Sequence, residues 1–215
     1  MTADNRSLAE TLPALPETAD ELRAIAKILG AKSEDIKLGE AASVTDIKHE
    51  PLSNYRIVYF ATHALVAGEV EKFAKVKAEP ALVLSIPERP TEDDDGLLRA
   101  SDVAMLEMNA DFVVLSACNT AAGDKPGAEA LSGLARAFFY AGAKSLVFSH
   151  WEVDSDATVE LMDGLFEALK VNPRLSHAEA LRLSMLRMIA NSSKPEWAQP
   201  QFWAPFVVVG EPQKH

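Results

Sequence analysis

The sequence has a single cysteine, Cys118, among its 215 residues. One thiol excludes an internal disulfide and a cysteine-based metal cage. Long hydrophobic runs are also missing. The longest apolar stretches, such as AFFYAGA, are far too short to span a bilayer, and the first residues, MTADNRSLAETLP, lack the apolar core of a signal peptide. We therefore expect a cytoplasmic protein that does not engage a membrane.

Positive charge is scarce, with 21 Lys and Arg against 32 Asp and Glu, which gives a net charge of −11. This balance argues against a nucleic-acid partner, because phosphates need a basic surface. The glycine-rich nucleotide-binding patterns and the G-x-S-x-G motif of serine hydrolases are also absent. No two histidines stand at metal-ligand spacing on a predicted helix, so no metal site is expected.

Apolar segments of strand length recur along the chain. They cover residues 55–61, 81–86, 111–117, 145–150 and 205–210. Their nearly continuous apolar character is typical of strands in a sheet that is covered on both faces. Helical patterns lie between several of them, which predicts an α/β fold with a mainly parallel sheet. Residues 1–14 are expected to be a tail or the end of a linker, and residues 15–215 a single domain.

Local signals refine this outline. Thr18 and Glu21 fit a capping box at the start of a helix that Gly30 would end. A short strand is predicted over 35–38. The acidic run 92–95 is interpreted as a solvated surface turn, and the segment DSD (154–156) as the cap of the helix that follows it. The predicted helices cover residues 128–143, 157–170 and 176–190, the last opening with a second capping box.

A histidine and a cysteine, which together can perform nucleophilic catalysis, each follow a predicted strand. His63 lies two residues after the strand 55–61, and Cys118 comes directly after the strand 111–117. If both strands are parallel, both side chains reach the same edge of the sheet, where sites gather in such folds. A nearby imidazole can take the proton of a thiol and later protonate a leaving group. The alternative from the residues alone is a small buried cysteine and a hydrogen-bonded surface histidine.

Four segments of the sequence resemble those of a known family. YFATHA, VVLSACNTAAGD, GAEALSGLARAFFYAGAKSLVFSHWEVD and the closing FWAPFVVVG are similar to the corresponding segments of CHAT domains, which are caspase-like cysteine peptidase domains. The resemblance runs from about Leu15 to Gly210. It implies a caspase-like three-layer αβα sandwich and a domain often joined to tetratricopeptide repeats. Family members usually carry a further stretch before this segment, so the resemblance also predicts a fragment, or a chain that another segment completes.

The resemblance implies roles for individual residues. Cys118 would be the nucleophile and His63 the general acid/base, while the backbone N–H groups of Cys118 and Ala64 would form the oxyanion hole. The family usually has glycine where this chain has Ala64, and a left-handed backbone there would strain an alanine.

The same resemblance implies a substrate-binding segment. Trp151 and Glu152, with Asp154 and Asp156, would line the pocket for the residue before the cleaved bond. Ser155 replaces a family aspartate there. Glu129 and Arg136 match positions that hold a helix against the active loop.

These residues imply a cysteine endopeptidase that needs no cofactor and acts on a protein or peptide. A partner protein or a tetratricopeptide-repeat region would regulate it. The alternative hypothesis is a caspase-like binding or scaffold module that has no catalytic activity. A cysteine hydrolase of other amides or esters would use the same pair of residues.

Overall fold

The structure is a computed structural model that describes residue 12 and residues 14–65, 79–116, 128–150 and 154–210. Its centre is a four-stranded sheet in the order β1-β5-β6-β7. The strands are β1 (Ile57–Ala61), β5 (Phe112–Ser116), β6 (Ser145–Ser149) and β7 (Phe206–Gly210). The first three are mutually parallel and β7 is antiparallel to β6. The predicted mainly parallel sheet is therefore confirmed.

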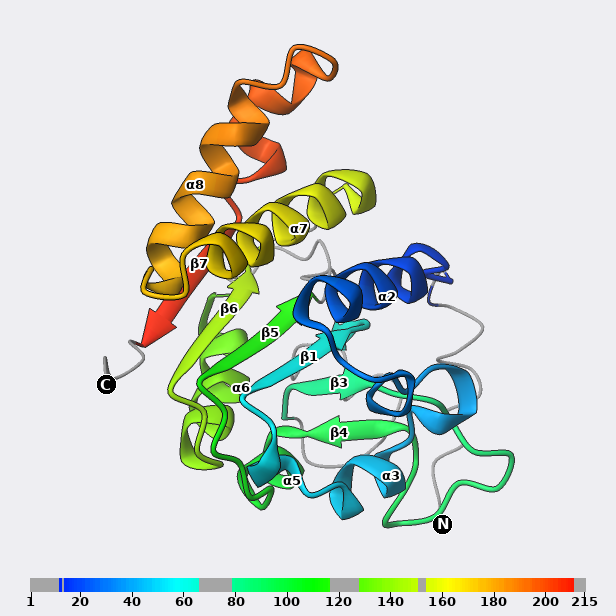
Figure 1. Ribbon diagram of the computed structural model, residues 1–215. Coiled ribbons are helices and arrows are strands. Elements are labelled where there is room, and N and C mark those ends of the chain that lie inside the picture. Colours follow the sequence, from blue (N-terminus) through cyan, green and yellow to red (C-terminus); the bar gives the residue numbers. More distant parts are fainter. Residues whose placement is uncertain (1–11, 13, 66–78, 117–127, 151–153, 211–215) are drawn as a thin grey trace.

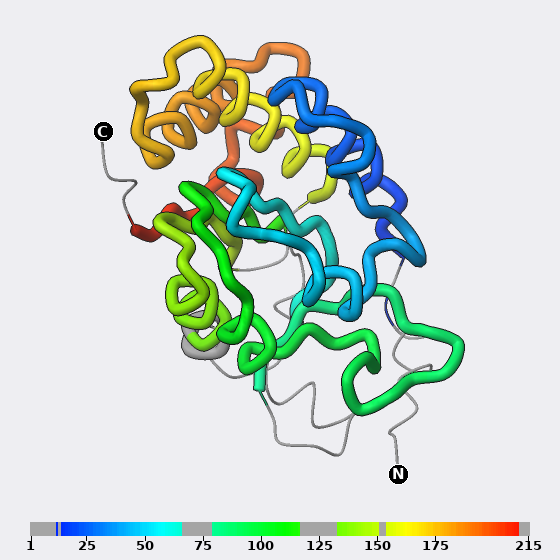
Figure 2. The backbone as a smooth tube through the Cα atoms, turned by 60° about the horizontal axis from the view of Figure 1, so that its bottom comes forward, coloured from blue at the N-terminus to red at the C-terminus, as the bar shows by residue number. Residues whose placement is uncertain are grey.

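Helices cover both faces of this sheet (Figure 1). One face packs on α2 (Glu17–Leu29), α7 (Ser155–Val171) and α8 (His177–Ile189). The other packs on α3 (Val44–His49), α5 (Ala100–Ala104) and α6 (Ala128–Tyr140). Figure 2 shows the first group of helices together on one side of the sheet. The three layers agree with a caspase-like αβα sandwich.

The side chains of the central strands explain these layers. Every residue of β5 and of β6 is buried, as nearly continuous apolar strands require. Along β1, the even residues Val58 and Phe60 belong to the core under α3, α5 and α6. The odd residues Ile57 and Tyr59 pack with the core under α2, α7 and α8. The alternation follows from the two-residue period of a strand.

A second sheet is small and antiparallel. Its order is β2-β3-β4, formed by β2 (Ala64–Leu65), β3 (Ala81–Val83) and β4 (Leu97–Arg99). The predicted strand 81–86 is thus real but shorter, and it belongs here rather than to the central sheet. The predicted strand 35–38 is wrong, because a 3-10 helix covers Ser33–Asp35. Residues 36–38 are extended at Ile36 and Leu38, and they form no part of either sheet.

Two local predictions also need correction. Helix α2 begins after Pro16, which makes no side-chain cap, so Thr18 and Glu21 do not form a capping box. Glu21 is instead buried, at 3% exposure. The acidic run 92–95 is not simply solvated, because Asp94 is buried and accepts hydrogen bonds from Thr45 of α3.

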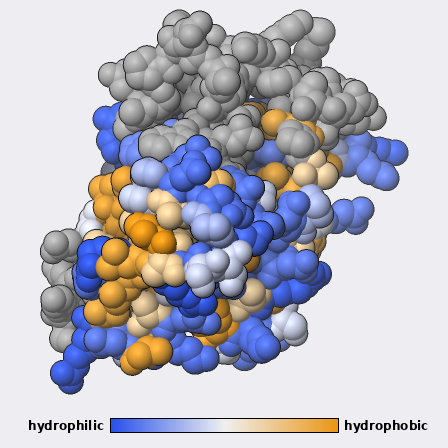
Figure 3. All heavy atoms as spheres, turned by 90° about the horizontal axis from the view of Figure 1, so that it is seen from above, coloured by the Kyte–Doolittle hydropathy of each residue, from blue (hydrophilic) through white to orange (hydrophobic). Residues whose placement is uncertain are grey.

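The outer surface of the helical layer mixes polar and apolar side chains (Figure 3). On α8 the exposed apolar residues are Leu183, Leu186 and Ile189. Among the helices that the structure describes, none combines the length and the apolar character needed to cross a bilayer.

Candidate active site

The carboxyl ends of β1 and β5 lie side by side. The two strands are parallel, with Ala61 opposite Ser116. The register continues one residue further, because the N–H of Thr62 donates to the carbonyl of Ser116 over 3.2 Å. His63 directly follows Thr62. Cys118 lies two positions after Ser116 in the sequence and is outside the described residues. The parallel pairing of the two strands is confirmed, and the arrival of the thiol at the same edge beside His63 stays a prediction.

His63 is held between the two sheets. β1 ends two residues before it and β2 begins one residue after it. Its carbonyl accepts a hydrogen bond of 2.9 Å from the N–H of Val83 in β3. The hydroxyl of Thr62 donates to the carbonyl of the same Val83. His63 as a whole residue is 9% exposed, so the backbone and the burial together restrict the orientation of its imidazole.

The backbone fixes the direction of the Ala64 N–H. In a trans peptide the C=O and the N–H point opposite ways, and the structure has no cis peptide among its described residues. Since the carbonyl of His63 points at Val83, the N–H of Ala64 points away from β3. Ala64 is also part of a regular strand, paired with Leu82. Extended backbone accepts a β-carbon without strain, so alanine fits where the family usually has glycine.

The predicted substrate-binding residues are only partly described. Trp151 and Glu152 lie outside the described residues. Asp154 is the N-cap of α7, where its carboxylate accepts a 2.9 Å hydrogen bond from the N–H of Ala157. Asp156 is exposed in the first turn of the same helix, where a negative charge is stabilised by the helix dipole. The predicted helix cap is therefore confirmed. A contact of either aspartate with substrate stays a prediction.

Three further candidates were His150, Glu129 and Arg136. His150 follows β6, and its N–H donates to the carbonyl of Pro205. Arg136 is exposed on α6, whereas the side chain of Glu129 is outside the described residues, so their predicted pairing is untested. Within the described part of the chain, no group of three His, Cys, Asp or Glu residues could hold a metal ion.

The sequence did not indicate a polar cluster that lies under this edge of the sheet. The hydroxyl of Tyr59 in β1 donates to the carboxyl of Glu21 in α2. Burial is the main reason why the pKa of Glu21 is raised, and hydrogen bonds from Tyr59 and Ser116 lower it in part. Asp163 of α7 adds a repulsive charge. The cluster therefore reaches Ser116, the last residue of β5. Only the carboxylate at an apolar helix position, Glu21, could have signalled it.

A mainly parallel αβα sandwich in which His63 follows the strand β1, parallel to β5, is compatible with a caspase-like protein. The CHAT domain matches residues 2–211, nearly the whole chain, and the chain belongs to this family. No curated protein matches the sequence. The caspase-like fold of the family agrees with the layers and the strand order described above.

Proposed function

We propose that the chain is a cysteine endopeptidase in which Cys118 attacks a peptide carbonyl and His63 serves as general acid/base. The observation that carries the proposal is the parallel pairing of β1 and β5, with Thr62 bonded to Ser116. This pairing brings the residue before His63 to the end of the strand that leads to Cys118. CHAT domains are a caspase-like family with peptidase activity among their members, and the chain is one of them.

The chemistry requires a thiolate and a place for the developing oxyanion. A free cysteine with a pKa of about 8.5 is only a few per cent ionised at neutral pH. An imidazole held at the sheet edge would accept the thiol proton and later donate it to the leaving amine. The N–H of Ala64 points away from β3 and would donate to the oxyanion of the tetrahedral intermediate. The backbone N–H of Cys118 would be the second donor.

Substrate and regulation complete the proposal. Trp151, Glu152, Asp154 and Asp156 would surround the side chain before the cleaved bond, and their acidic members favour a basic residue there. The substrate would be a protein or peptide segment in extended form. A tetratricopeptide-repeat region or another regulatory protein would control the access to the site.

Cysteine alkylation tests the proposal directly, because the chain has one thiol. The rate of reaction with iodoacetamide is measured from about pH 5 to 9 in the wild type, in His63→Ala and in His49→Ala. His49 is exposed on α3 and provides a matched control. We expect an inflection well below about 8.5 in the wild type and in His49→Ala. In His63→Ala the inflection should return toward that value.

A cleavage screen with a peptide library then separates peptidase activity from hydrolysis of other amides or esters. If the thiol reacts slowly and His63→Ala changes nothing, the alternative of a caspase-like binding module replaces the proposal. Efficient labelling with no peptide cleaved favours the other cysteine hydrolases instead.

A further inference from the structure

The edge of β1 opposite to β5 carries backbone groups that form no hydrogen bond within the described residues. The carbonyl of Arg56 accepts from Phe112, and the N–H of Thr62 donates to Ser116, so both groups point at β5. Because the peptide groups are trans, the N–H of Ile57 and the carbonyl of Ala61 point the other way. By the alternation along a strand, Tyr59 also directs its backbone groups to this edge. Ile57, Tyr59 and Ala61 thus direct backbone N–H and C=O groups to this edge, where another strand could pair with them.

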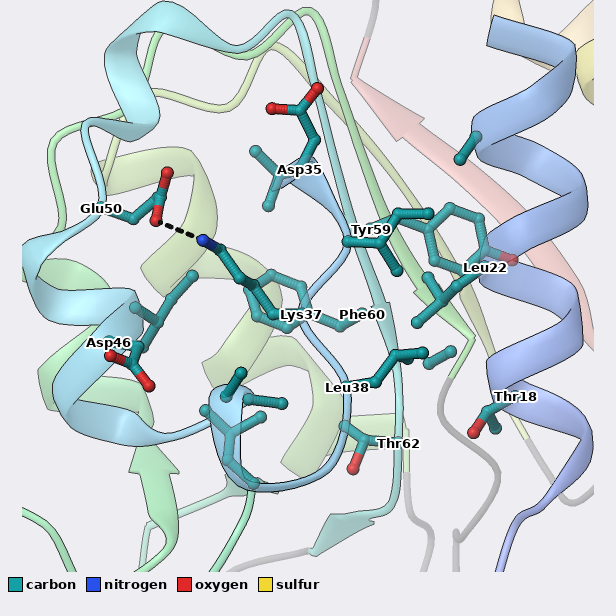
Figure 4. A pocket seen from close by; sticks show the side chains of 18 of the residues that line it. Thr18, Leu22, Asp35, Lys37, Leu38, Asp46, Glu50, Tyr59, Phe60 and Thr62 are labelled. Carbon is teal, nitrogen blue, oxygen red and sulfur yellow. Dashed lines mark ion pairs between the residues drawn. The ribbon is translucent and has the colours of Figure 1, made fainter. Parts of the chain in front are cut away.

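A cavity of about 400 Å³ lies along this edge. β1 and residues 36–38 both line it, and α2 and α3 lie on its two sides (Figure 4). The volume is within the range of ligand sites in proteins, about 300–1,000 Å³. Buried backbone donors and acceptors are almost always satisfied in folded proteins. An open strand edge beside a cavity of this size therefore indicates a site for another backbone.

The lining of the cavity is apolar on both sides of the sheet plane. On the side of α2 it includes Leu22, Ile25 and Leu29, and on the side of α3 it includes Ile47 and Leu52. A segment seated here would be covered on both faces, as the central strands β5 and β6 are. Such strands consist of nearly continuous Val, Ile and Leu rather than alternating apolar and polar residues.

The charged lining of the cavity is mainly acidic. Asp35 and Asp46 line it, and neither forms an ion pair with a basic residue in the described part of the chain. Lys37, the lining cation, is paired with Glu50 at 3.4 Å, as the dashed line in Figure 4 marks. A Lys or Arg next to the apolar stretch would meet this unbalanced charge.

We propose that this cavity, the β1-edge slot, receives one strand from a separate polypeptide segment. The occupant is an extended stretch of about five residues, rich in Val, Ile and Leu, with a Lys or Arg at one end. It pairs its backbone with Ile57, Tyr59 and Ala61, as strand addition does in other peptide-binding proteins. It extends the central sheet at the edge that bears His63, and its binding does not require catalytic activity.

The first test is selection of peptides on the full chain from a displayed library of seven-residue peptides. A parallel selection uses Ala26→Trp, which fills the cavity from α2, and Ala190→Trp is the matched control on the exposed end of α8. We expect the wild type to enrich apolar sequences with a terminal Lys or Arg. Their enrichment should be unchanged on Ala190→Trp and at least tenfold lower on Ala26→Trp. Failure to enrich such sequences, or equal enrichment on Ala26→Trp, would overturn the proposal.

The second test uses the wild type alone and does not depend on the folding of a variant. Amide hydrogen exchange is followed by NMR with and without the best selected peptide. Binding should slow exchange at Ile57, Tyr59 and Ala61 by at least tenfold. Val58 and Phe60, whose amides face β5, should change little. Methylation of alternate peptide nitrogens should weaken binding, and a uniform effect of methylation would contradict strand pairing. A dimer of the chain that Ala26→Trp abolishes would show a second copy as the occupant instead.

Discussion

The hydroxyl of Tyr59 donates a hydrogen bond to the carboxyl of Glu21, and the pair joins helix α2 to the edge strand β1. Burial raises the pKa of both groups. Ser116, at the end of β5, interacts with both side chains. A buried carboxyl is therefore coupled to the strand that precedes the cysteine segment, on the opposite side of the sheet from α6.

Glu21→Gln should remove a pH dependence of the stability. The pKa of Glu21 is raised in the folded state above its ordinary value of 4.5, so the folded chain binds the proton more tightly than the unfolded chain. Its contribution is fully present below 4.5 and is lost as the pH rises through the folded pKa. The free energy of unfolding is measured by urea denaturation from about pH 4 to 8. The wild-type value minus the Glu21→Gln value should fall over this range.

Asp163 is coupled to this difference, since burial raises its own pKa and its charge helps to raise that of Glu21. Asp163→Asn should remove its own contribution and reduce that of Glu21 only in part, because burial is the larger cause of the Glu21 shift. Tyr59→Phe should cost about 1–3 kcal/mol, because it deprives a buried carboxyl of its donor. A wild-type-minus-Gln difference that does not vary with pH would mean that Glu21 has an ordinary pKa.

His177 should act on stability in the opposite sense. Its ring stacks on Phe112 at a centroid distance of 3.9 Å, and Nδ1 lies 2.5 Å from the hydroxyl of Ser145. That hydroxyl donates to the carbonyl of Asp111, so Nδ1 carries a proton and donates to Ser145. Burial lowers the pKa of His177 from 6.5 to about 4. The nearby charges of Asp111 and Arg56 raise and lower it, respectively.

Because the folded pKa of His177 is depressed, the unfolded chain binds more protons between about 4 and 6.5. The stabilisation is present above 6.5 and is lost as the pH falls toward 4. His177→Phe keeps the stacking and should remove a dependence of about 1–3 kcal/mol, the lower figure allowing for solvent screening. Urea denaturation at pH 4.5 and 7 measures it. His49→Phe, at an exposed position, should leave the dependence unchanged.

The central sheet could be predicted from the sequence because its strands are nearly continuous apolar runs. The position of His63 after β1 followed from the same pattern. The strands β2, β3 and β4 have only two or three residues each, too few for a period to be visible. Segment 35–38 has the composition of a strand, but within the described residues its backbone pairs with no other strand. Composition alone does not show whether a segment has a neighbouring strand with which to form hydrogen bonds.

The sequence indicates candidate residues for the site but not their surroundings. The orientation of the Ala64 N–H depends on the bond between His63 and Val83, two residues that are 20 positions apart. The inward position of Glu21 depends on Tyr59, which the chain brings to α2 only when β1 is in the sheet. From the sequence, Thr18 followed by Glu21 at the start of a helical pattern favours a capping box. A sequence pattern describes only such local hydrogen bonds and not contacts with a distant strand.

Asp94 should be the acidic residue of its turn that matters for stability. Its carboxylate accepts bonds from the N–H and the hydroxyl of Thr45, at 2.9 and 2.7 Å, and from the N–H of Gly96. Asp94→Ala leaves these donors without an acceptor and should cost about 2–4 kcal/mol. Asp93→Ala changes an exposed neighbour and should stay within about 0.5 kcal/mol. Thermal unfolding of the two variants checks this, and equal values would restore the solvated-turn interpretation.

Asp154 can be tested as a helix cap and as a substrate contact separately. Asn caps a helix as well as Asp does, so Asp154→Asn should keep the stability, whereas Asp154→Ala should lose about 1 kcal/mol. If the charge also meets a basic substrate side chain, its removal weakens that contact by about 1 kcal/mol, roughly fivefold. The measurement is the ratio of Cys118 labelling rates by two peptidyl ketones that differ only in Arg or Leu before the reactive group. A fivefold fall of this ratio in Asp154→Asn, with Asp93→Asn unchanged, would assign the charge to substrate selection. An unchanged ratio would leave Asp154 as the cap of α7, and the preference for a basic residue would lose its support.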